Sequence, residues 1–137
     1  MEIEGILKKF EMRCEAETAL VWVATQDEGI PHLAPVCFVK SLGKWRILIA
    51  NIFLSKTVEN IKAGSKVALG MSFMNNGRDG YLLKGKAEVL EKGALFGNFY
   101  REIVEKTGGK RKPRSGILVK VEEIYSLKPY RGKKRLL

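Results

Sequence analysis

The chain is poor in the residue types that carry catalytic chemistry by themselves. Its 137 residues include one histidine, His32, and two cysteines, Cys14 and Cys37, which match no CxxC spacing. A cluster of metal ligands or a redox pair of thiols is therefore not expected, and reduced, mostly packed thiols are the default for the two cysteines. The sequence identifies no catalytic side chain and no metal site.

Long apolar runs are also absent. No run approaches the roughly 20 residues that a membrane-spanning helix needs. The first ten residues contain two glutamates and two lysines instead of the apolar centre of a signal peptide. We therefore expect a cytoplasmic protein without membrane association. A length of 137 residues with 45% hydrophobic composition suits a single domain over residues 1–137.

Acidic residues are scarce in the last part of the chain. Residues 1–109 hold 15 basic and 13 acidic side chains, whereas residues 110–137 hold 10 and 2, so +8 of the net charge of +10 lies there. The runs 110–114 and 131–135 are interpreted as a loop and as part of a basic C-terminal tail, 129–137. One interpretation is a basic β-barrel that binds nucleic acid. The lack of aromatic residues interleaved with the basic runs disfavours it.

The hydrophobic pattern predicts alternating strands with a few helices. Strands are expected over residues 18–25, 30–40, 45–50, 67–73, 81–90 and 117–127, a loop over residues 75–80, and helices near Ile3, Ser55 and Phe96. Pro31 and Pro35 lack the N–H of a sheet ladder, so the second strand should lie at an edge or a gap. Trp22 and Trp45 are expected in the core. Six mostly adjacent strands favour an antiparallel β-barrel of α+β type, mainly β.

Residues 47–61 change from strand to helical periodicity between Asn51 and Ser55. Ser55 is a good N-cap candidate, and Gly64 can end the helix. The amides that open a helix have no intrahelical acceptor, so Ser55, Lys56 and Thr57 are candidates for holding an anion. The alternative is an ordinary capped helix with a solvated Lys56.

Several motifs occur in the order and spacing of a known family. They are Ala24-Thr25, residues 29–36 with the sequence Gly-Ile-Pro-His-Leu-Ala-Pro-Val, residues 55–61 with Ser-Lys-Thr-Val-Glu-Asn-Ile, residues 66–69, and residues 80–89. Together these motifs, within residues 16–127, resemble the FMN-binding split-barrel family, which includes pyridoxamine 5′-phosphate oxidase and small FMN-binding proteins. The resemblance implies a six-stranded antiparallel split β-barrel of Greek-key type with short flanking helices.

The resemblance also implies a homodimer with FMN at the subunit interface. Carried onto this chain, Ser55, Lys56 and Thr57 would hold the phosphate, and Tyr81 on the fifth strand is the expected contribution of the partner subunit. The flavin ring would lie along two segments, Pro35, Val36 and Cys37 on the second strand and Ala50, Asn51 and Ile52 after the third.

The same resemblance predicts an FMN-dependent oxidoreductase or electron-transfer protein, similar to a flavin reductase. A nicotinamide or a protein is the expected electron donor, and an FMN carrier without turnover is the alternative. Two departures argue against a true pyridoxamine phosphate oxidase. Ser55-Lys56 replaces an arginine-lysine pair, and residues 125–137 contain no tryptophan. His32, next to a predicted hairpin turn, is expected to be structural.

Overall fold

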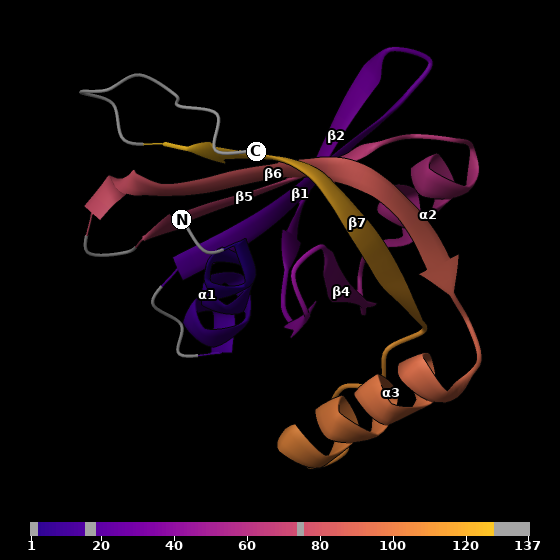
Figure 1. Ribbon diagram of the computed structural model, residues 1–137. Coiled ribbons are helices and arrows are strands. Elements are labelled where there is room, and N and C mark those ends of the chain that lie inside the picture. Colours follow the sequence, from indigo (N-terminus) through magenta and orange to yellow (C-terminus); the bar gives the residue numbers. More distant parts are fainter. Residues whose placement is uncertain (1–2, 16–18, 74–75, 128–137) are drawn as a thin grey trace.

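The computed structural model describes residues 3–15, 19–73 and 76–127. In chain order the elements are α1 (Ile3–Glu15), β1 (Ala19–Asp27), β2 (Ile30–Val36), β3 (Val39–Leu42), β4 (Arg46–Asn51), α2 (Ser55–Lys62), β5 (Val67–Phe73), β6 (Asn76–Leu90), α3 (Ala94–Lys106) and β7 (Ser115–Ser126) (Figure 1). None of the described helices is long and apolar enough to cross a membrane. The cytoplasmic location stays a prediction. So does the single domain, because the tail 129–137 lies outside the described residues.

The described strands form one antiparallel sheet in the order β2-β1-β5-β6-β7-β4-β3. The fold is mainly β, as predicted, but the predicted barrel is not closed, because β2 and β3 are the two edges of an open sheet. The predicted number of six strands is wrong, since residues 30–40 form two strands. At Cys37 and Phe38 the chain stops pairing with β1, and from β3 onward it pairs with β4. This change comes just after Pro35, which has no N–H to donate to a neighbouring strand. Phe38 O accepts a hydrogen bond from Ala50 N at 3.1 Å.

The sheet buries apolar side chains on both faces of β4. Every residue of this strand except Arg46 is buried. Ile47 and Ile49 belong to the main core, together with buried residues of α1. Leu48 and Ala50 pack with buried residues of α3. Because successive side chains of a strand point to opposite faces, α1 and α3 cover opposite sides of this part of the sheet.

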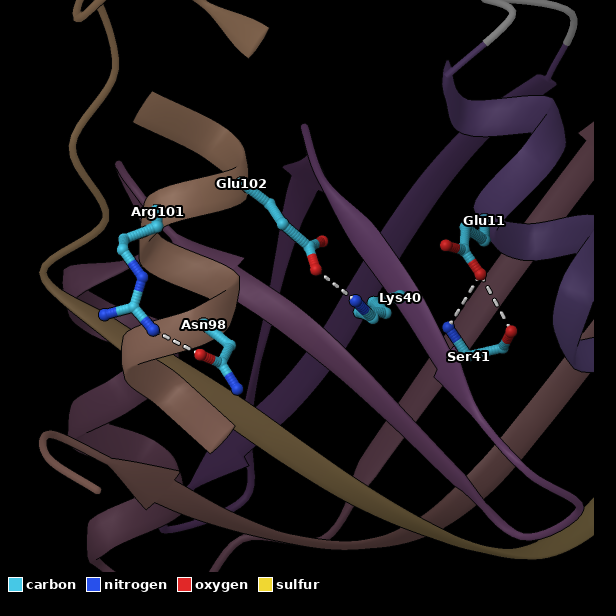
Figure 2. Close-up of polar contacts among 6 residues, drawn as sticks. All are labelled: Glu11, Lys40, Ser41, Asn98, Arg101 and Glu102. Carbon is cyan, nitrogen blue, oxygen red and sulfur yellow. Dashed lines mark hydrogen bonds and ion pairs between the residues drawn. The ribbon is translucent and has the colours of Figure 1, made fainter. Parts of the chain in front are cut away.

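The edge strand β3 lies between these two helices, and two consecutive residues bind one helix each (Figure 2). Lys40 Nζ forms an ion pair with the Glu102 carboxylate of α3. Ser41 donates two hydrogen bonds to Glu11 Oε2 of α1, from N at 3.1 Å and from Oγ at 2.8 Å. These contacts hold the edge strand on the side where the sheet offers it no further neighbour.

The predicted loop over residues 75–80 is wrong for its described part, because β6 begins at Asn76. Gly80 lies so close to β5 that a Cβ atom on it would stand 1.9 Å from Met71 O. Glycines suggest loops in a sequence, but here a glycine permits two strands to approach closely.

Both tryptophans were expected in the core, and this expectation is wrong. Trp22 is 39% exposed and Trp45 is 42% exposed. On β1 the core-facing positions are taken by smaller residues such as Val21, which is 2% exposed. Trp22 instead lines an open cavity of about 480 Å³ together with Leu20, Leu33 and residues of β5.

Candidate functional site

One buried side chain, that of Asn51, organises the junction between β4 and α2. Asn51 is 5% exposed. Its Oδ1 accepts a hydrogen bond from Leu54 N at 2.9 Å, and its Nδ2 donates one to Ser115 Oγ at 3.0 Å. An asparagine side chain that accepts from a nearby backbone N–H bends the chain at that point. The predicted change from strand to helix between Asn51 and Ser55 is thus confirmed.

The helix α2 begins at Ser55 without a side-chain cap. Its N-cap residue is Leu54, whose carbonyl oxygen accepts a hydrogen bond from Val58 N at 2.9 Å. The prediction of Ser55 as N-cap is wrong because the turn made by Asn51 starts the helix one residue earlier. Among the described residues, none accepts a hydrogen bond from the first three helical amides. Such amides, at the positive end of the helix dipole, favour an anion.

Lys56 adds a positive charge to this helix start. Its Nζ lies 3.8 Å from Oδ2 of Asp27, the last residue of β1, and the two side chains are 50% and 45% exposed. Because both groups are well solvated, the ion pair contributes little to stability. Lys56 is therefore able to turn toward an anion at the helix start. Ser55 is exposed beside it.

The two residues before Asp27 also bind α2 and the turn that follows it. Thr25 Oγ1 accepts a hydrogen bond from Asn60 Nδ2 at 3.0 Å. Gln26 N donates to Ser65 Oγ at 3.0 Å. The last three residues of β1 thus all contact α2 or the turn after it, and the buried hydrogen bond of Thr25 fixes the helix against the sheet. The position of its first turn is set by β1 as well as by β4.

Thr57, predicted to contact the anion, has its side chain inside the protein. It is fully buried, and its Oγ1 has no hydrogen-bond partner among the described residues. Asn60 Oδ1, one turn further along α2, also lacks a partner there. A buried hydroxyl without a partner is costly, and an anion or a water at the first turn would compensate. The donor set of free amides, ammonium and hydroxyl fits a phosphate.

At its other end α2 carries a different ion pair. Lys62 Nζ donates to Glu91 Oε1 at 2.8 Å, and this hydrogen bond, with the lysine charge, lowers the pKa of Glu91 below its usual range. Gly64, with φ of 104°, follows the C-cap as predicted from the sequence.

The two predicted ring-binding segments lie next to each other. The hydrogen bond between Phe38 and Ala50 joins the residue after Cys37 to the end of β4. Pro35 and Cys37 are exposed, so the expectation of a packed thiol is wrong for Cys37. Val36, Ala50 and Ile52 are buried, with 7%, 1% and 8% exposed. The two segments thus form one continuous surface, here called the wall, on which the small side chains of Pro35 and Cys37 are exposed.

Tyr81 lies apart from this group in the described chain. It is on β6, where its Oη accepts a hydrogen bond from Lys9 Nζ of α1 at 3.3 Å and its ring packs edge-on against Phe73 at 6.3 Å between centroids. Neither contact involves α2 or the residues before it. A contribution of Tyr81 from a partner subunit stays a prediction.

The sequence predicted the basic loop over residues 110–114 but not its position beside the site. Residues 107–114, between α3 and β7, lie against the junction of β4 and α2, because Arg114 N donates to Asn51 O at 2.8 Å. Arg111 Cζ stands 5.2 Å from the centroid of the Phe53 ring. The run of cations was visible in the sequence, but its contact with Phe53, 58 positions earlier, was not.

Comparisons with known proteins identify the family. Residues 9–128 match the family model of pyridoxamine 5′-phosphate oxidase. An uncharacterized protein of Methanocaldococcus jannaschii is 34% identical over 122 residues, covering 86% of this chain and 79% of that protein. This chain therefore belongs to the pyridoxamine 5′-phosphate oxidase family.

Solved structures share the fold. An FMN-binding protein from Syntrophomonas wolfei superposes with a TM-score of 0.75 at 18% identity, covering 90% of this chain and 87% of that chain. A protein from Clostridium acetobutylicum, related to general stress protein 26 of B. subtilis and to the pyridoxinephosphate oxidase family, has a TM-score of 0.70 at 19% identity. That match covers 97% of this chain and 94% of the other.

Proposed function

We propose that the protein binds FMN and acts as a flavin-dependent oxidoreductase or electron-transfer protein. The observation that carries the proposal is the uncapped start of α2, where three amides that have no acceptor among the described residues lie in one turn with Lys56. A phosphate accepts several hydrogen bonds and is favoured at such a helix start. Membership of this family and the likeness to an FMN-binding protein support FMN as the source of the phosphate.

In this proposal Ser55, Lys56 and Thr57 hold the phosphate. The ring lies along the wall formed by residues 35–37 and 50–52, whose exposed positions contact it and whose buried positions fix its shape. The flavin supplies the redox chemistry when bound. The chain binds the phosphate, orients the ring and limits its access to water.

The proposal includes a two-fold homodimer. Leu20, Trp22 and Leu33 form an apolar outer face on β1 and β2, with 58%, 39% and 61% of their surfaces exposed. Pro35, a proposed ring contact, is paired with Trp22 across these strands. A second copy packed on this face would therefore reach the flavin, and Tyr81 is the proposed contribution of that copy.

No side chain at the wall is a clear general acid or base. Cys37 is exposed there, but hydride or electron transfer by a flavin needs no thiol. His32 is on β2, paired with Thr25, and its structural role stays a prediction. We infer a reductase-like or electron-transfer activity with a nicotinamide or protein donor, and not oxidation of pyridoxamine phosphate.

Titration calorimetry with FMN and riboflavin tests the phosphate site. FMN should bind at least about tenfold more tightly, a difference of about 1.4 kcal/mol, because riboflavin lacks the phosphate. Equal affinities would show that α2 does not hold the phosphate. Anaerobic stopped-flow mixing of the FMN-loaded protein with reduced nicotinamides then separates an oxidoreductase from a carrier, in which the flavin would stay oxidised.

A further inference from the structure

The loop between α3 and β7 carries a concentration of unpaired positive charge. Residues 107–114 read Thr-Gly-Gly-Lys-Arg-Lys-Pro-Arg and contain no acidic residue. Lys110, Arg111, Lys112 and Arg114 are all exposed, and none forms an ion pair within the described part of the chain. Like charges held close together repel one another, and an anion bound among them would relieve this repulsion.

Backbone contacts hold this loop in place. Thr107 Oγ1 accepts a hydrogen bond from Arg111 N at 3.1 Å, and Lys110 N donates to Thr107 O at 3.1 Å. At its end the loop is tied to β4 by Arg114 N, which donates to Asn51 O, and Pro113 is buried. The four cations therefore project from a loop whose backbone is fixed at both ends.

An exposed aromatic ring lies beside these cations. Phe53 is 72% exposed, although it lies between the buried residues Ile52 and Leu54. The Arg111 guanidinium covers one side of its ring, with Cζ at 5.2 Å from the centroid. The high exposure leaves the rest of the ring open to a planar group. A ring stacked between a cation and solvent, next to further cations, is suited to a planar molecule with phosphate groups.

We propose that Phe53 and the basic loop form a second anion site, which binds a phosphorylated dinucleotide. A base or nicotinamide ring stacks on Phe53, and the phosphates bind Arg111 and its neighbouring cations. Asn51 belongs to the proposed FMN site and also bonds to the basic loop. The bound dinucleotide would be the electron donor of the flavin, and this role rests on the proposed function. A single aromatic ring suits one nucleotide better than a nucleic-acid strand, which needs a row of stacking residues.

Titration calorimetry with NADP⁺ tests the site without any redox step. Arg111→Ala and Phe53→Ala should each weaken NADP⁺ binding by about fivefold or more, the size expected for one exposed cation–π or stacking contact. Phe53→Tyr should restore most of the affinity. Lys86→Ala removes the same charge from the middle of β6, and this control should change affinity by less than about twofold.

The titration is run on protein without FMN and on FMN-loaded protein, so failure of this site and failure of the FMN proposal are separate results. FMN affinity should stay within about twofold in all four variants. Equal NADP⁺ affinity in wild type, Arg111→Ala and Phe53→Ala would overturn the proposal. The proposal would also be overturned if single-stranded DNA bound more tightly than NADP⁺ and if Arg111→Ala and Phe53→Ala abolished that DNA binding. The loop would then be a nucleic-acid surface.

Discussion

At the scale of single residues, the site depends on the Asn51 side chain, which points into the protein interior. Asn51 is buried, and it bonds to Leu54 N, to Ser115 Oγ and, through its carbonyl oxygen, to Arg114 N. It therefore connects β4, the start of α2 and the basic loop. Ser55 and Lys56, which are proposed to contact the phosphate, lie at the surface, and their positions depend on this buried residue.

Replacement of Asn51 should destabilise the fold. Asn51→Ala leaves Leu54 N and Ser115 Oγ without their partners in a buried place, which should lower the free energy of unfolding by about 2 kcal/mol. Urea denaturation measures the change. Asn98→Ala is the control, because the Asn98 side chain is exposed on α3 and its one hydrogen bond among the described residues comes from Arg101 (Figure 2), so stability should change by less than about 0.5 kcal/mol. Equal effects would show that the junction is not held by Asn51.

Lys56 should matter for FMN and not for the fold. Lys56→Ala should weaken FMN binding by about tenfold, or about 1.4 kcal/mol, because a charge-assisted contact to the phosphate is lost. Riboflavin affinity should be unchanged. Lys62→Ala at the far end of α2 removes a solvated ion pair with Glu91 and serves as the control. If both variants bind FMN equally well, Lys56 is not a phosphate ligand.

At the scale of elements, the pairing of β6 with β7 depends on one glycine. The register shifts between Lys84 and Gly85. A Cβ atom on Gly85 would stand 2.0 Å from Lys120 O, in the backbone of the neighbouring strand. No rotation of a side chain can relieve such a contact, since the obstacle is a backbone atom. The longest strand pair in the sheet thus tolerates only glycine at this point.

Gly85→Ala should therefore lower the free energy of unfolding by about 1–3 kcal/mol, the usual cost of overpacking. Gly70→Ala on β5 is a matched control, because a Cβ atom there would meet no atom within 4 Å. That substitution should be neutral or stabilising by a few tenths of a kcal/mol, since it restricts the unfolded chain. Thermal unfolding of both variants measures the difference. A stable Gly85→Ala variant would mean that β6 and β7 can separate without cost.

At the scale of the whole molecule, the outer face of β1 and β2 is an apolar area that the described part of the fold leaves open. Trp22, Leu20 and Leu33 surround a cavity of about 480 Å³ there. Exposed apolar patches of this kind mark interaction surfaces in soluble proteins. The face continues to Pro35, so a second copy would cover both the patch and the proposed flavin wall.

Trp22→Glu should abolish the proposed homodimer, because it places a charge in the centre of this face. Trp45→Glu is the control, since Trp45 has nearly the same exposure, 42% against 39%, but lies before β4. Sedimentation velocity should give twice the chain mass for wild type and Trp45→Glu and a single chain mass for Trp22→Glu. A wild-type monomer with FMN bound would contradict the dimer.

The sequence by itself determined the local features of this protein. The periodicity of residues 47–61 located the change from β4 to α2, and the apolar spacing around Phe99 located α3. Pro31 and Pro35 predicted an edge or a gap at this strand, and β2 is an edge strand, because a missing N–H is a property of the residue alone. These features depend on interactions within a few residues, which spacing reveals.

Only the tertiary structure decided what depends on distant partners. The break of residues 30–40 into β2 and β3 arises because one half pairs with β1 and the other with β4. Neighbouring strands and loops likewise decide three other features. These are the exposure of Trp22, the extended conformation of residues 76–80 and the contact of Arg111 with Phe53. The pattern of one segment shows that one of its faces is apolar or basic. The packing of the whole chain decides which other segment contacts that face.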